Sequence, residues 1–327
     1  MALSGASDTL ELRTGVPIDL RVSYCSREHV DERLSELVAR PFLVGDRLCR
    51  ADLFRISDTD HILLIVGHAL VVDHNGFLAI MGDIEKIYRM ASGQKPTDML
   101  RPLPSSIESA CNWPSAVREE HTDFWIKSLG DSVPRLELPT DWPRQPIKTY
   151  KGGQIVVPIP ATMAERVASW ACSQDMEPAS VWFASFTALI LRLTGQPDLL
   201  TGIESDRVSG KATEGVVART RDVVPVRSSY HHGVSFMEWV RTMHGRIDKA
   251  RQNCSLSFAE LIELLQLPRD QSRSALVSVV FRKEDLGVAP AFGNINAAYA
   301  VPPAAGARHD IDFTWYNTPD GWQLACQ

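Results

Sequence analysis

The amino-acid sequence predicts an α/β fold, because segments with helical periodicity alternate with short apolar strands in both halves of the chain. Of the 327 residues, 44% are hydrophobic and 23% are charged, which is typical of a globular protein with a substantial core. That length allows two ordinary domains or one large two-lobed domain. Five of the six residues from 62 to 67 are apolar, a pattern that predicts a strand covered on both faces. The strand ends in polar residues, which predicts a candidate functional site there.

The first half of the chain is predicted to hold three helices and two strands. Residues 31–39 form a helix, since Leu34, Leu37 and Val38 share one face and charged residues occupy the other. Apolar residues recur at three- and four-residue spacing in residues 77–90, which predicts an amphipathic helix there too. The remaining expected elements are strands at 48–56 and 62–66, a loop at 94–104 and a helix at 119–129.

A proline-rich segment separates the two halves. Residues 139–146 contain three prolines, which cannot continue a helix or occupy a central strand. The sequence therefore predicts a lobe boundary here, with one lobe at residues 1–142 and the other at 143–327.

Two helices of the second half carry strong start signals. Ser235 with Glu238, and Ser257 with Glu260, match the capping box, in which the serine and the glutamate satisfy each other's backbone N–H groups. The other expected elements are helices at 161–175 and 178–194 and strands at 154–159, 199–203, 275–281, 310–316 and 322–325.

Charge and cysteine content exclude several classes of function. The formal net charge is −6 and no basic cluster is visible, which argues against a nucleic-acid-binding surface. The six cysteines lie far apart without a Cys-x-x-Cys pair, so we expect free thiols in a reducing cytoplasm. No segment resembles a signal peptide or a membrane span. His-Glu-x-x-His, Gly-x-Ser-x-Gly and phosphate-loop motifs are absent, and no metal site is predicted.

The polar segment after the strand at 62–66 reads His68-Ala69-Leu70-Val71-Val72-Asp73-His74. It resembles the His-His-x-x-x-Asp-Gly signature of the condensation domains of nonribosomal peptide synthetases. Further landmarks of that family follow in the right order. They are Arg40-Pro41-Phe42, Phe124-Trp125 before Leu136–Asp141, Leu193–Asp198, a degraded motif at Ala218–Val223, and Arg269–Leu276.

The resemblance implies a fold, partners and substrates. The fold has two chloramphenicol-acetyltransferase-like lobes in a V, each a mixed sheet with flanking helices, with an incomplete N-terminal lobe and a truncated C-terminal lobe. The implied partners are peptidyl or acyl carrier protein domains and other synthetase modules. No cofactor is expected to be bound, because the substrates arrive on the phosphopantetheine arms of carrier proteins.

The resemblance also assigns roles to individual residues. The second histidine of the signature, which the family uses at the reacting amine, is Ala69 in this chain. His68 is expected to support the loop, and Asp73 to pair with Arg273 of the second lobe. Gly76 and Asp222 are expected to support the site structurally.

Ala69 leaves two functional hypotheses open. If the family's histidine acts as a base or positioning group, its loss removes about 10²–10⁴-fold of rate. His74 is the one candidate substitute, although it stands where the family has glycine. The first hypothesis is an impaired or inactive amide-bond-forming acyl or peptidyl transferase. The alternative is a non-catalytic, condensation-like scaffold that binds a carrier protein or a tailoring enzyme. An acyltransferase acting on free coenzyme A thioesters is a weaker third hypothesis, since it needs the same histidine.

Overall fold

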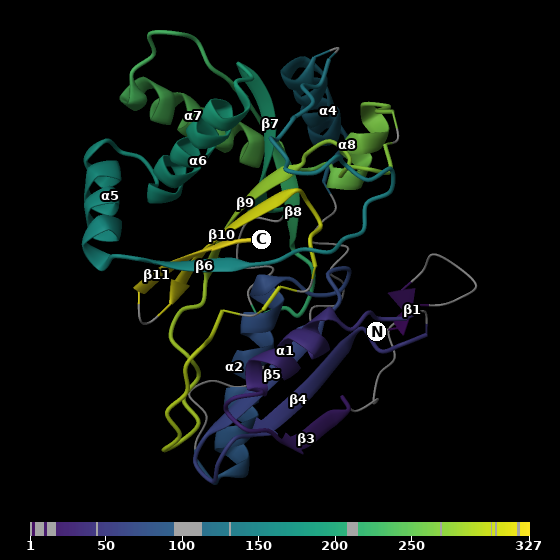
Figure 1. The fold of residues 1–327 in the computed structure, drawn as a ribbon, viewed down its shortest axis with the longest axis vertical. Helices are drawn as coiled ribbons and strands as arrows, with labels where there is room; N and C mark the ends of the chain where they lie inside the picture. Colours follow the sequence, from purple (N-terminus) through teal and green to yellow (C-terminus); the bar gives the residue numbers. More distant parts are fainter. Residues whose placement is uncertain are drawn as a thin grey trace. The chain divides into compact units, whose positions relative to one another are not determined.

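The computed structural model describes residues 2–3, 10–11, 18–43, 45–94, 113–130, 132–207, 215–268, 270–301, 303–304, 306–318 and 321–327 (Figure 1). The chain divides into two compact units. Unit 1 comprises Met1–Arg101, Gly215–Arg219 and Val301–Gly306. Unit 2 comprises Pro102–Glu214, Thr220–Ala300 and Ala307–Gln327. The predicted loop at 94–104 lies almost wholly outside the described residues.

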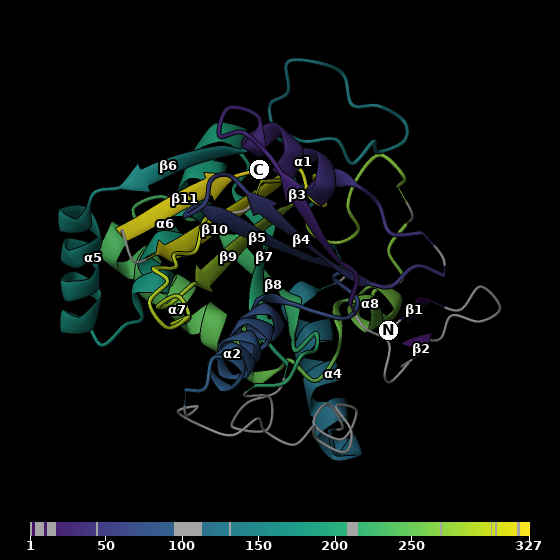
Figure 2. The same cartoon turned by 90° about the horizontal axis from the view of Figure 1, so that it is seen from below.

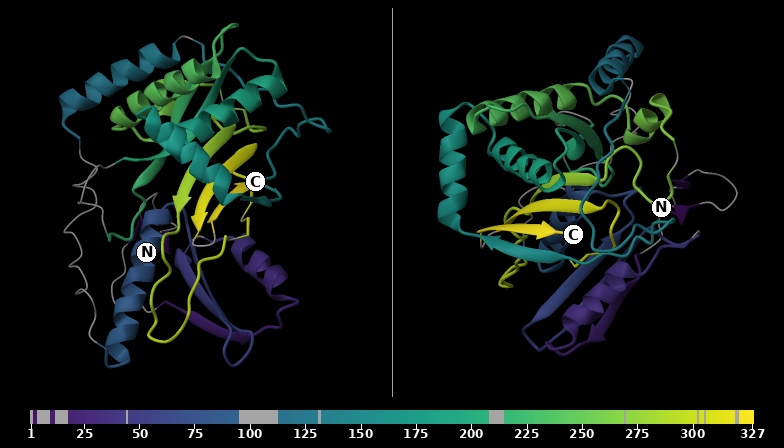
Figure 3. Two further views of the ribbon diagram at one scale, coloured as in Figure 1. Left: turned by 90° about the vertical axis from the view of Figure 1, so that its left-hand side faces the viewer. Right: turned by 45° about the horizontal axis from the view of Figure 1, so that its top comes forward.

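Unit 1 contains a three-stranded sheet with a helix on each face. The strand order is β3 (Leu20–Tyr24), β4 (Cys49–Arg55) and β5 (His61–Gly67), with β3 parallel and β5 antiparallel to β4. Helices α1 (Val30–Ala39) and α2 (His74–Ala91) lie on opposite faces of this sheet (Figures 2 and 3). A two-residue antiparallel pair, β1 (Ala2–Leu3) with β2 (Leu10–Glu11), precedes it.

The strand before the candidate site is less buried than its sequence suggests. The apolar run predicts burial on both faces, but every residue of β5 is half-buried or exposed. Among the described strands β5 is the edge of its sheet. An apolar run alone does not show whether both faces of a strand are buried. The prediction that this strand is covered on both faces was wrong.

Unit 2 contains a six-stranded mixed sheet, which is the larger part of the fold. Its order is β6-β11-β10-β9-β7-β8. The pairs β9–β10 and β7–β9 are parallel and the other pairs are antiparallel. The strands span Ile155–Ile159 (β6), Asp198–Asp206 (β7), Arg221–Ser229 (β8), Val279–Asp285 (β9), Ile311–Thr318 (β10) and Gly321–Cys326 (β11).

Helices cover one face of this sheet (Figure 3, right). Ser235 and Ser257 each form the predicted capping box, with Glu238 and Glu260, at the start of α7 and α8. The apolar helix predicted at 178–194 is α6, with eight buried residues. The helices of unit 2 span Ser115–Leu129 (α4), Ala161–Ser173 (α5), Pro178–Thr194 (α6), Phe236–Gln252 (α7) and Phe258–Leu264 (α8). None of the helices in the described part of the chain is long and apolar enough to cross a membrane.

The boundary between the two compact units lies at a different place in the sequence from the lobe boundary predicted at 142–143. The change from unit 1 to unit 2 falls between Arg101 and Pro102, so α4 belongs to unit 2. The reason is packing: Trp125, Leu129 and Leu136 are buried in the core of unit 2. The indole N–H of Trp125 also donates to the carbonyl of Asn253 at 2.8 Å. The lobe boundary and the V-shaped arrangement of the lobes stay predictions.

Candidate functional site

A tight turn joins the end of β5 to the start of α2 and carries the predicted signature residues. The N–H of His68 donates to the carbonyl of Leu48 at 2.8 Å, which anchors the turn to the residue before β4. The carbonyl of His68 accepts from the N–H groups of Val71 at 2.9 Å and Val72 at 3.3 Å. Val71 and Val72 are buried with Leu48 in a small core, packed by Phe42, Phe77, Ile80 and Val217. The turn is therefore held by backbone hydrogen bonds and by its two valines.

His68 is a supporting residue of the turn. Its Nδ1 accepts a hydrogen bond from the N–H of Leu70 at 3.1 Å, which in a neutral imidazole places the proton on Nε2. Its ring packs edge-on against Phe42, with the ring centroids 5.8 Å apart. These contacts are those of a side chain that shapes the loop.

Asp73 caps helix α2. Its backbone is extended, and its Oδ1 accepts from the N–H of Gly76 at 3.0 Å, which satisfies one of the free N–H groups of the first helical turn. Its own N–H donates to the carbonyl of Ala218 at 3.4 Å, on the segment 215–219 that returns to unit 1. Asp73 therefore fixes both the start of the helix and its approach to this segment. The sequence analysis did not assign this capping role, because it placed the start of the helix at residue 77.

Two glycines allow the close packing around the turn. A Cβ added at Gly67 would lie 2.2 Å from Val72 Cγ1, and one added at Gly76 would lie 2.8 Å from Val72 Cγ2 and 3.0 Å from the carbonyl oxygen of Ala218. Such distances are too short for carbon atoms, so larger residues would push the valine or the backbone away. Gly76 therefore has a steric role in the packing of this turn, and its predicted support of a reaction site stays a prediction.

Ala69 lies at the tip of the turn and is exposed. Its methyl group has no donor, acceptor or titratable atom. His74, the candidate substitute, is the first residue of α2 and is half-buried. The turn thus exposes Ala69 one residue after His68, whose side chain contacts the turn itself. That this is the position of the family's second histidine stays a prediction from the resemblance.

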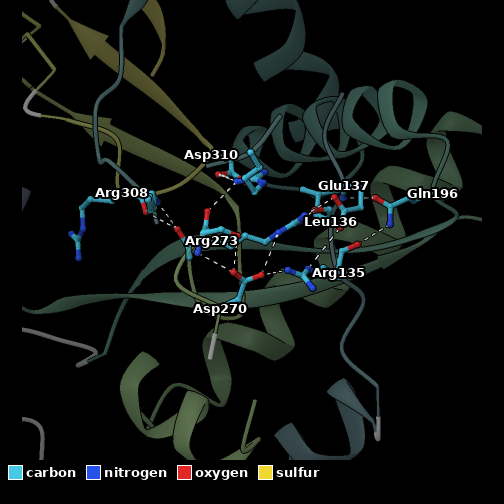
Figure 4. Close-up of polar contacts among 12 residues, drawn as sticks. Arg135, Leu136, Glu137, Gln196, Asp270, Arg273, Arg308 and Asp310 are labelled. Carbon is cyan, nitrogen blue, oxygen red and sulfur yellow. Dashed lines mark hydrogen bonds and ion pairs between the residues drawn. The ribbon is translucent and has the colours of Figure 1, made fainter. Parts of the chain in front are cut away.

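Arg273 lies in a polar network of unit 2 (Figure 4). Its terminal nitrogens donate to the carbonyl of Leu136 at 2.9 Å and to the carboxylate of Glu137 at 2.7 Å. Asp270 accepts from the N–H and hydroxyl of Ser272 at 2.9 and 2.6 Å, and these two contacts lower the pKa of Asp270. Arg273 therefore fastens the segment at 136–137 within unit 2. The expected pair with Asp73, a residue of unit 1, stays a prediction.

The same network fastens the proline-rich segment. Gln196 holds the residues just before it by accepting from the N–H of Glu137 and donating to the carbonyl of Arg135, each at 2.8 Å. Arg144 forms a two-pronged ion pair with Asp310 at 2.7 and 2.9 Å. This hydrogen-bonded ion pair raises the pKa of Arg144. The segment predicted to link the lobes is therefore held along the surface of unit 2.

Asp222 supports unit 2 rather than a reacting group. It is 7% exposed, and its carboxylate accepts from the N–H groups of Val223 at 2.9 Å and Phe258 at 3.0 Å. Phe258 is the first residue of α8, so Asp222 fixes the start of that helix against β8. The predicted role of Asp222 in supporting the reaction site stays a prediction.

A buried ion-pair network was not predicted from the sequence. Arg282 of β9 donates to Glu204 at 3.0 Å and to Asp312 at 2.5 Å, and His309 contacts Asp312 at 2.9 Å. Burial alone would raise the pKa of Glu204, but the charges of Arg282 and Arg221 hold it below its usual value. These groups come from segments that are distant in the sequence, so no local motif could predict the network.

A serine, a histidine and an aspartate also meet in unit 2. Ser180 Oγ lies 2.9 Å from His244 Nδ1, and His244 Nε2 lies 3.4 Å from Asp248. The order resembles a nucleophile, a base and an orienting acid. Ser180 is 1% exposed, however, so a substrate cannot reach its hydroxyl. These contacts join α6 to α7.

The described residues contain no group of three or more potential metal ligands. His121 is buried, and its Nδ1 accepts from the N–H of Ser255 at 3.3 Å. Burial lowers the pKa of His121, which favours the neutral ring. It is therefore a core residue of unit 2.

The comparisons with known proteins agree on one family. The family model described as Condensation domain matches residues 16–299. A linear gramicidin synthase from Brevibacillus parabrevis is 28% identical over 315 residues, which cover 93% of this chain and 6% of that protein. The chain therefore spans a small part of the length of this curated relative.

Solved structures share the fold across the whole chain. A complex of the X-domain and OxyB from teicoplanin biosynthesis matches with a TM-score of 0.79 and 20% identity, over 99% of this chain and 75% of the matched chain. The first condensation domain of the CDA synthetase matches with a TM-score of 0.78 and 16% identity, over 100% and 75% respectively. At these identities the likeness establishes the fold, a mixed α/β architecture with two main sheets and flanking helices.

Proposed function

The chain belongs to the condensation-domain family, and we propose that it acts in nonribosomal peptide biosynthesis, where an amide bond forms between two carrier-bound substrates. We further propose that the bond-forming step is impaired or absent, because Ala69 stands where the family has its reactive histidine. The observation that carries the proposal is the turn between β5 and α2. It has the supporting histidine His68 and the capping aspartate Asp73, whereas Ala69 and His74 stand where the family signature has its second histidine and its glycine.

The proposed reaction shows what the missing imidazole would do. The amine nitrogen of the acceptor attacks the carbonyl carbon of the donor thioester, the C–N bond forms, and the C–S bond breaks. The proton that leaves the nitrogen ends on the departing sulfur. A positioned base that carries this proton is worth about 10²–10⁴-fold in rate. A methyl group at residue 69 cannot accept it.

What remains without the histidine is positioning. Holding two reactants in a productive orientation lowers the barrier even where no side chain moves a proton. His68 does not take over readily through Nδ1, since that nitrogen accepts from the N–H of Leu70. We therefore propose slow condensation by proximity as the upper limit of activity.

A single-turnover assay with loaded donor and acceptor carrier proteins tests this proposal. Ala69→His is expected to raise the rate of amide formation about 10²–10⁴-fold. Leu70→His is the matched control, since Leu70 is the next residue and is 45% exposed but does not occupy the signature position. It is expected to leave the rate unchanged. Failure of Ala69→His to form product above the uncatalysed rate would refute an impaired transferase.

A second proposal is a non-catalytic role, favoured by Ala69 itself. The chain would then bind a carrier protein or a tailoring enzyme without forming a bond. The likeness to an X-domain that was solved in complex with OxyB supports this recruitment role. Binding to carrier and tailoring partners should then be unchanged by Ala69→His, while no amide is formed. Binding no tighter than to an unrelated carrier would contradict this alternative.

A further inference from the structure

Strand β3 lies at one edge of the sheet of unit 1 (Figure 1). It pairs with β4 on one side, and no described strand pairs with its other side. All five residues of β3 are exposed, and so are the two residues before it, Ile18 and Asp19. An edge strand carries a row of unpaired N–H and C=O groups, which can pair with a further strand. Residues 18–24 are therefore a candidate interaction surface, and we refer to them as the β3 edge.

The other sheet edges among the described strands are better protected. β6 and β8 are the two edges of the sheet of unit 2, and each contains a proline, Pro158 and Pro225. A proline has no N–H to donate, which hinders pairing with a further strand. β5 is the second edge in unit 1, and five of its seven residues are half-buried. The β3 edge contains no proline and no lysine, and each of its residues is exposed.

The β3 edge also exposes apolar side chains on one face of the sheet. Ile18, Leu20 and Val22 alternate with charged residues, so the three side chains share a face. They are 53%, 53% and 64% exposed. The apolar face continues across the sheet, since Val22 lies beside Leu53 of β4, which in turn lies beside the exposed Leu63 of β5. Extension of the sheet by another strand would remove part of this apolar surface from water.

The charges of the β3 edge indicate which partner fits. Asp19 and Arg21 flank Leu20 and lie 3.5 Å from each other, both more than half exposed. Such an exposed ion pair adds little to the stability of a chain. If a second copy runs antiparallel with its Leu20 opposite Leu20, each Asp19 lies opposite an Arg21 of the other copy. Opposite charges directly across a strand pair are stabilising, so the β3 edge is complementary to itself.

Other registers of the same strand pair are less favourable. Pairing centred on Asp19 or on Arg21 places like charges directly opposite each other, which is destabilising. Pairing centred on Val22 leaves both charged residues without an opposite charge across the strands. A shift by one residue would place the apolar side chains of one copy beside the charged side chains of the other. Only the register centred on Leu20 matches charge with opposite charge and Ile18 with Val22.

We propose that two copies of this chain associate through their β3 edges, antiparallel and with Leu20 opposite Leu20. The two three-stranded sheets then form one continuous sheet, and a two-fold axis passes between the two leucines. One pair of short strands gives an interface at the small end of the known range, so the dimer should be weak and concentration-dependent. The proposal does not depend on the condensation chemistry proposed above.

Sedimentation equilibrium of the 327-residue chain tests the association. Over concentrations from about 1 to 200 µM, the apparent mass should rise from 36.3 kDa toward twice that value. A mass that stays at 36.3 kDa over this range would overturn the proposal and leave the β3 edge to a strand of another protein. Ala69→His should leave the dimerisation constant unchanged, so this proposal and the proposed function fail separately.

Charge variants test whether the two copies recognise each other as proposed. Asp19→Arg and Arg21→Asp should each weaken dimerisation by about tenfold or more, because each change places like charges opposite each other at two symmetric positions. The double variant Asp19→Arg/Arg21→Asp restores opposite charges in the same register, and it should dimerise as well as the unmodified chain. Equal dimerisation by all four proteins would refute the register.

Leu20→Lys tests the centre of the interface. It places two ammonium groups opposite each other and should abolish the dimer within the same concentration range. Leu43→Lys is the matched control, since Leu43 is a 65% exposed leucine of unit 1 outside the β3 edge, and it should dimerise normally. Circular dichroism shows whether each variant is folded. If Leu20→Lys is not, the charge variants decide the matter. A folded Leu20→Lys that still dimerises would contradict the proposal.

Cysteine cross-linking locates the register directly. Opposed residues of antiparallel strands have Cα atoms about 4.5–5.5 Å apart, a separation that a disulfide can bridge. Leu20→Cys should therefore form a covalent dimer on mild oxidation. Val22→Cys is the control on the same strand face, because its two copies would lie about 13 Å apart along the strands. The unmodified chain, which has cysteines of its own, gives the background. Cross-linking at residue 22 but not at residue 20 would overturn the proposal.

Discussion

Two glycines of helix α2 are expected to respond in opposite directions to the same substitution. In Gly76→Ala, the new Cβ would lie 2.8 Å from Val72 Cγ2, 3.0 Å from the carbonyl oxygen of Ala218 and 3.2 Å from its nitrogen. Overpacking of this kind costs about 1–3 kcal/mol. The better helix propensity of alanine returns about 0.5–1 kcal/mol. We therefore expect a net loss of about 1–2 kcal/mol.

Gly82 is the matched control. It lies in the same helix, and an added Cβ would find no atom within 4 Å. Gly82→Ala should therefore stabilise the helix by about 0.5–1 kcal/mol. The two variants then differ by about 2 kcal/mol, which corresponds to a gap of about 3 °C in Tm for a chain of 327 residues. Thermal unfolding followed by circular dichroism measures it. A Tm for Gly76→Ala equal to or above that of the unmodified chain would refute the close approach of segment 215–219 to α2.

Two predictions concern the buried ion-pair network. Arg282→Met removes the cation that Glu204 and Asp312 share, and it should cost about 3–5 kcal/mol in urea denaturation. Arg166→Met, at an exposed position of α5, should change stability by less than about 0.5 kcal/mol. Similar losses in both variants would contradict the network's role. Burial alone would raise the pKa of Asp312, but the hydrogen bond from His309 and the charge of Arg282 hold it below its ordinary value. Because the folded-state pKa is lowered, this stabilisation is present at neutral pH and is lost as the pH falls below about 4. Unfolding free energies between pH 7 and 2.5 should therefore decline less steeply below pH 4 in Asp312→Asn, and an unchanged slope would count against this reasoning.

The features that were predictable from the sequence are those that local interactions determine. Each capping box joins two residues that are three positions apart. The pairs Ser235 with Glu238 and Ser257 with Glu260 could therefore be recognised as local sequence motifs. The amphipathic helix of the candidate site follows from its periodicity in the same way, although it begins at His74 rather than Phe77. Residues 74–76 belong to the helix but not to the predicted range. They are helical because Asp73 caps the helix, so that the first turn begins directly after it.

The strands predicted at 48–56, 62–66, 154–159, 199–203, 310–316 and 322–325 are confirmed as β4, β5, β6, β7, β10 and β11. Other strands were shifted or missed, because their stability comes from distant partners. The strand predicted at 275–281 is β9, Val279–Asp285, and it includes four charged residues. A run of charges normally ends a strand, but Arg282 is paired with carboxylates of neighbouring strands, and no single-sequence pattern contains that information. β8 was not predicted as a strand and holds Pro225, which is tolerated because β8 is the edge of its sheet among the described strands.

Strand β3 was missed although a local signal exists. Leu20, Val22 and Tyr24 alternate with polar residues, which is the period of a strand. All five residues of the strand are exposed, so burial does not add to the signal. The placement of β3 beside β4 comes from parallel pairing with residues about thirty positions later in the chain.

The interactions that hold the turn do not depend on the side chain at residue 69. The turn is maintained by the backbone of His68, the cap of Asp73 and the close packing of Gly67 and Gly76. None of these interactions uses the side chain of Ala69, which is exposed. If the proposed ancestral histidine stood at this position, its replacement by alanine would remove none of these contacts. For the same reason, restoring histidine at residue 69 requires no repacking. The rate of the Ala69→His variant then reports on the chemistry of the site rather than on its folding.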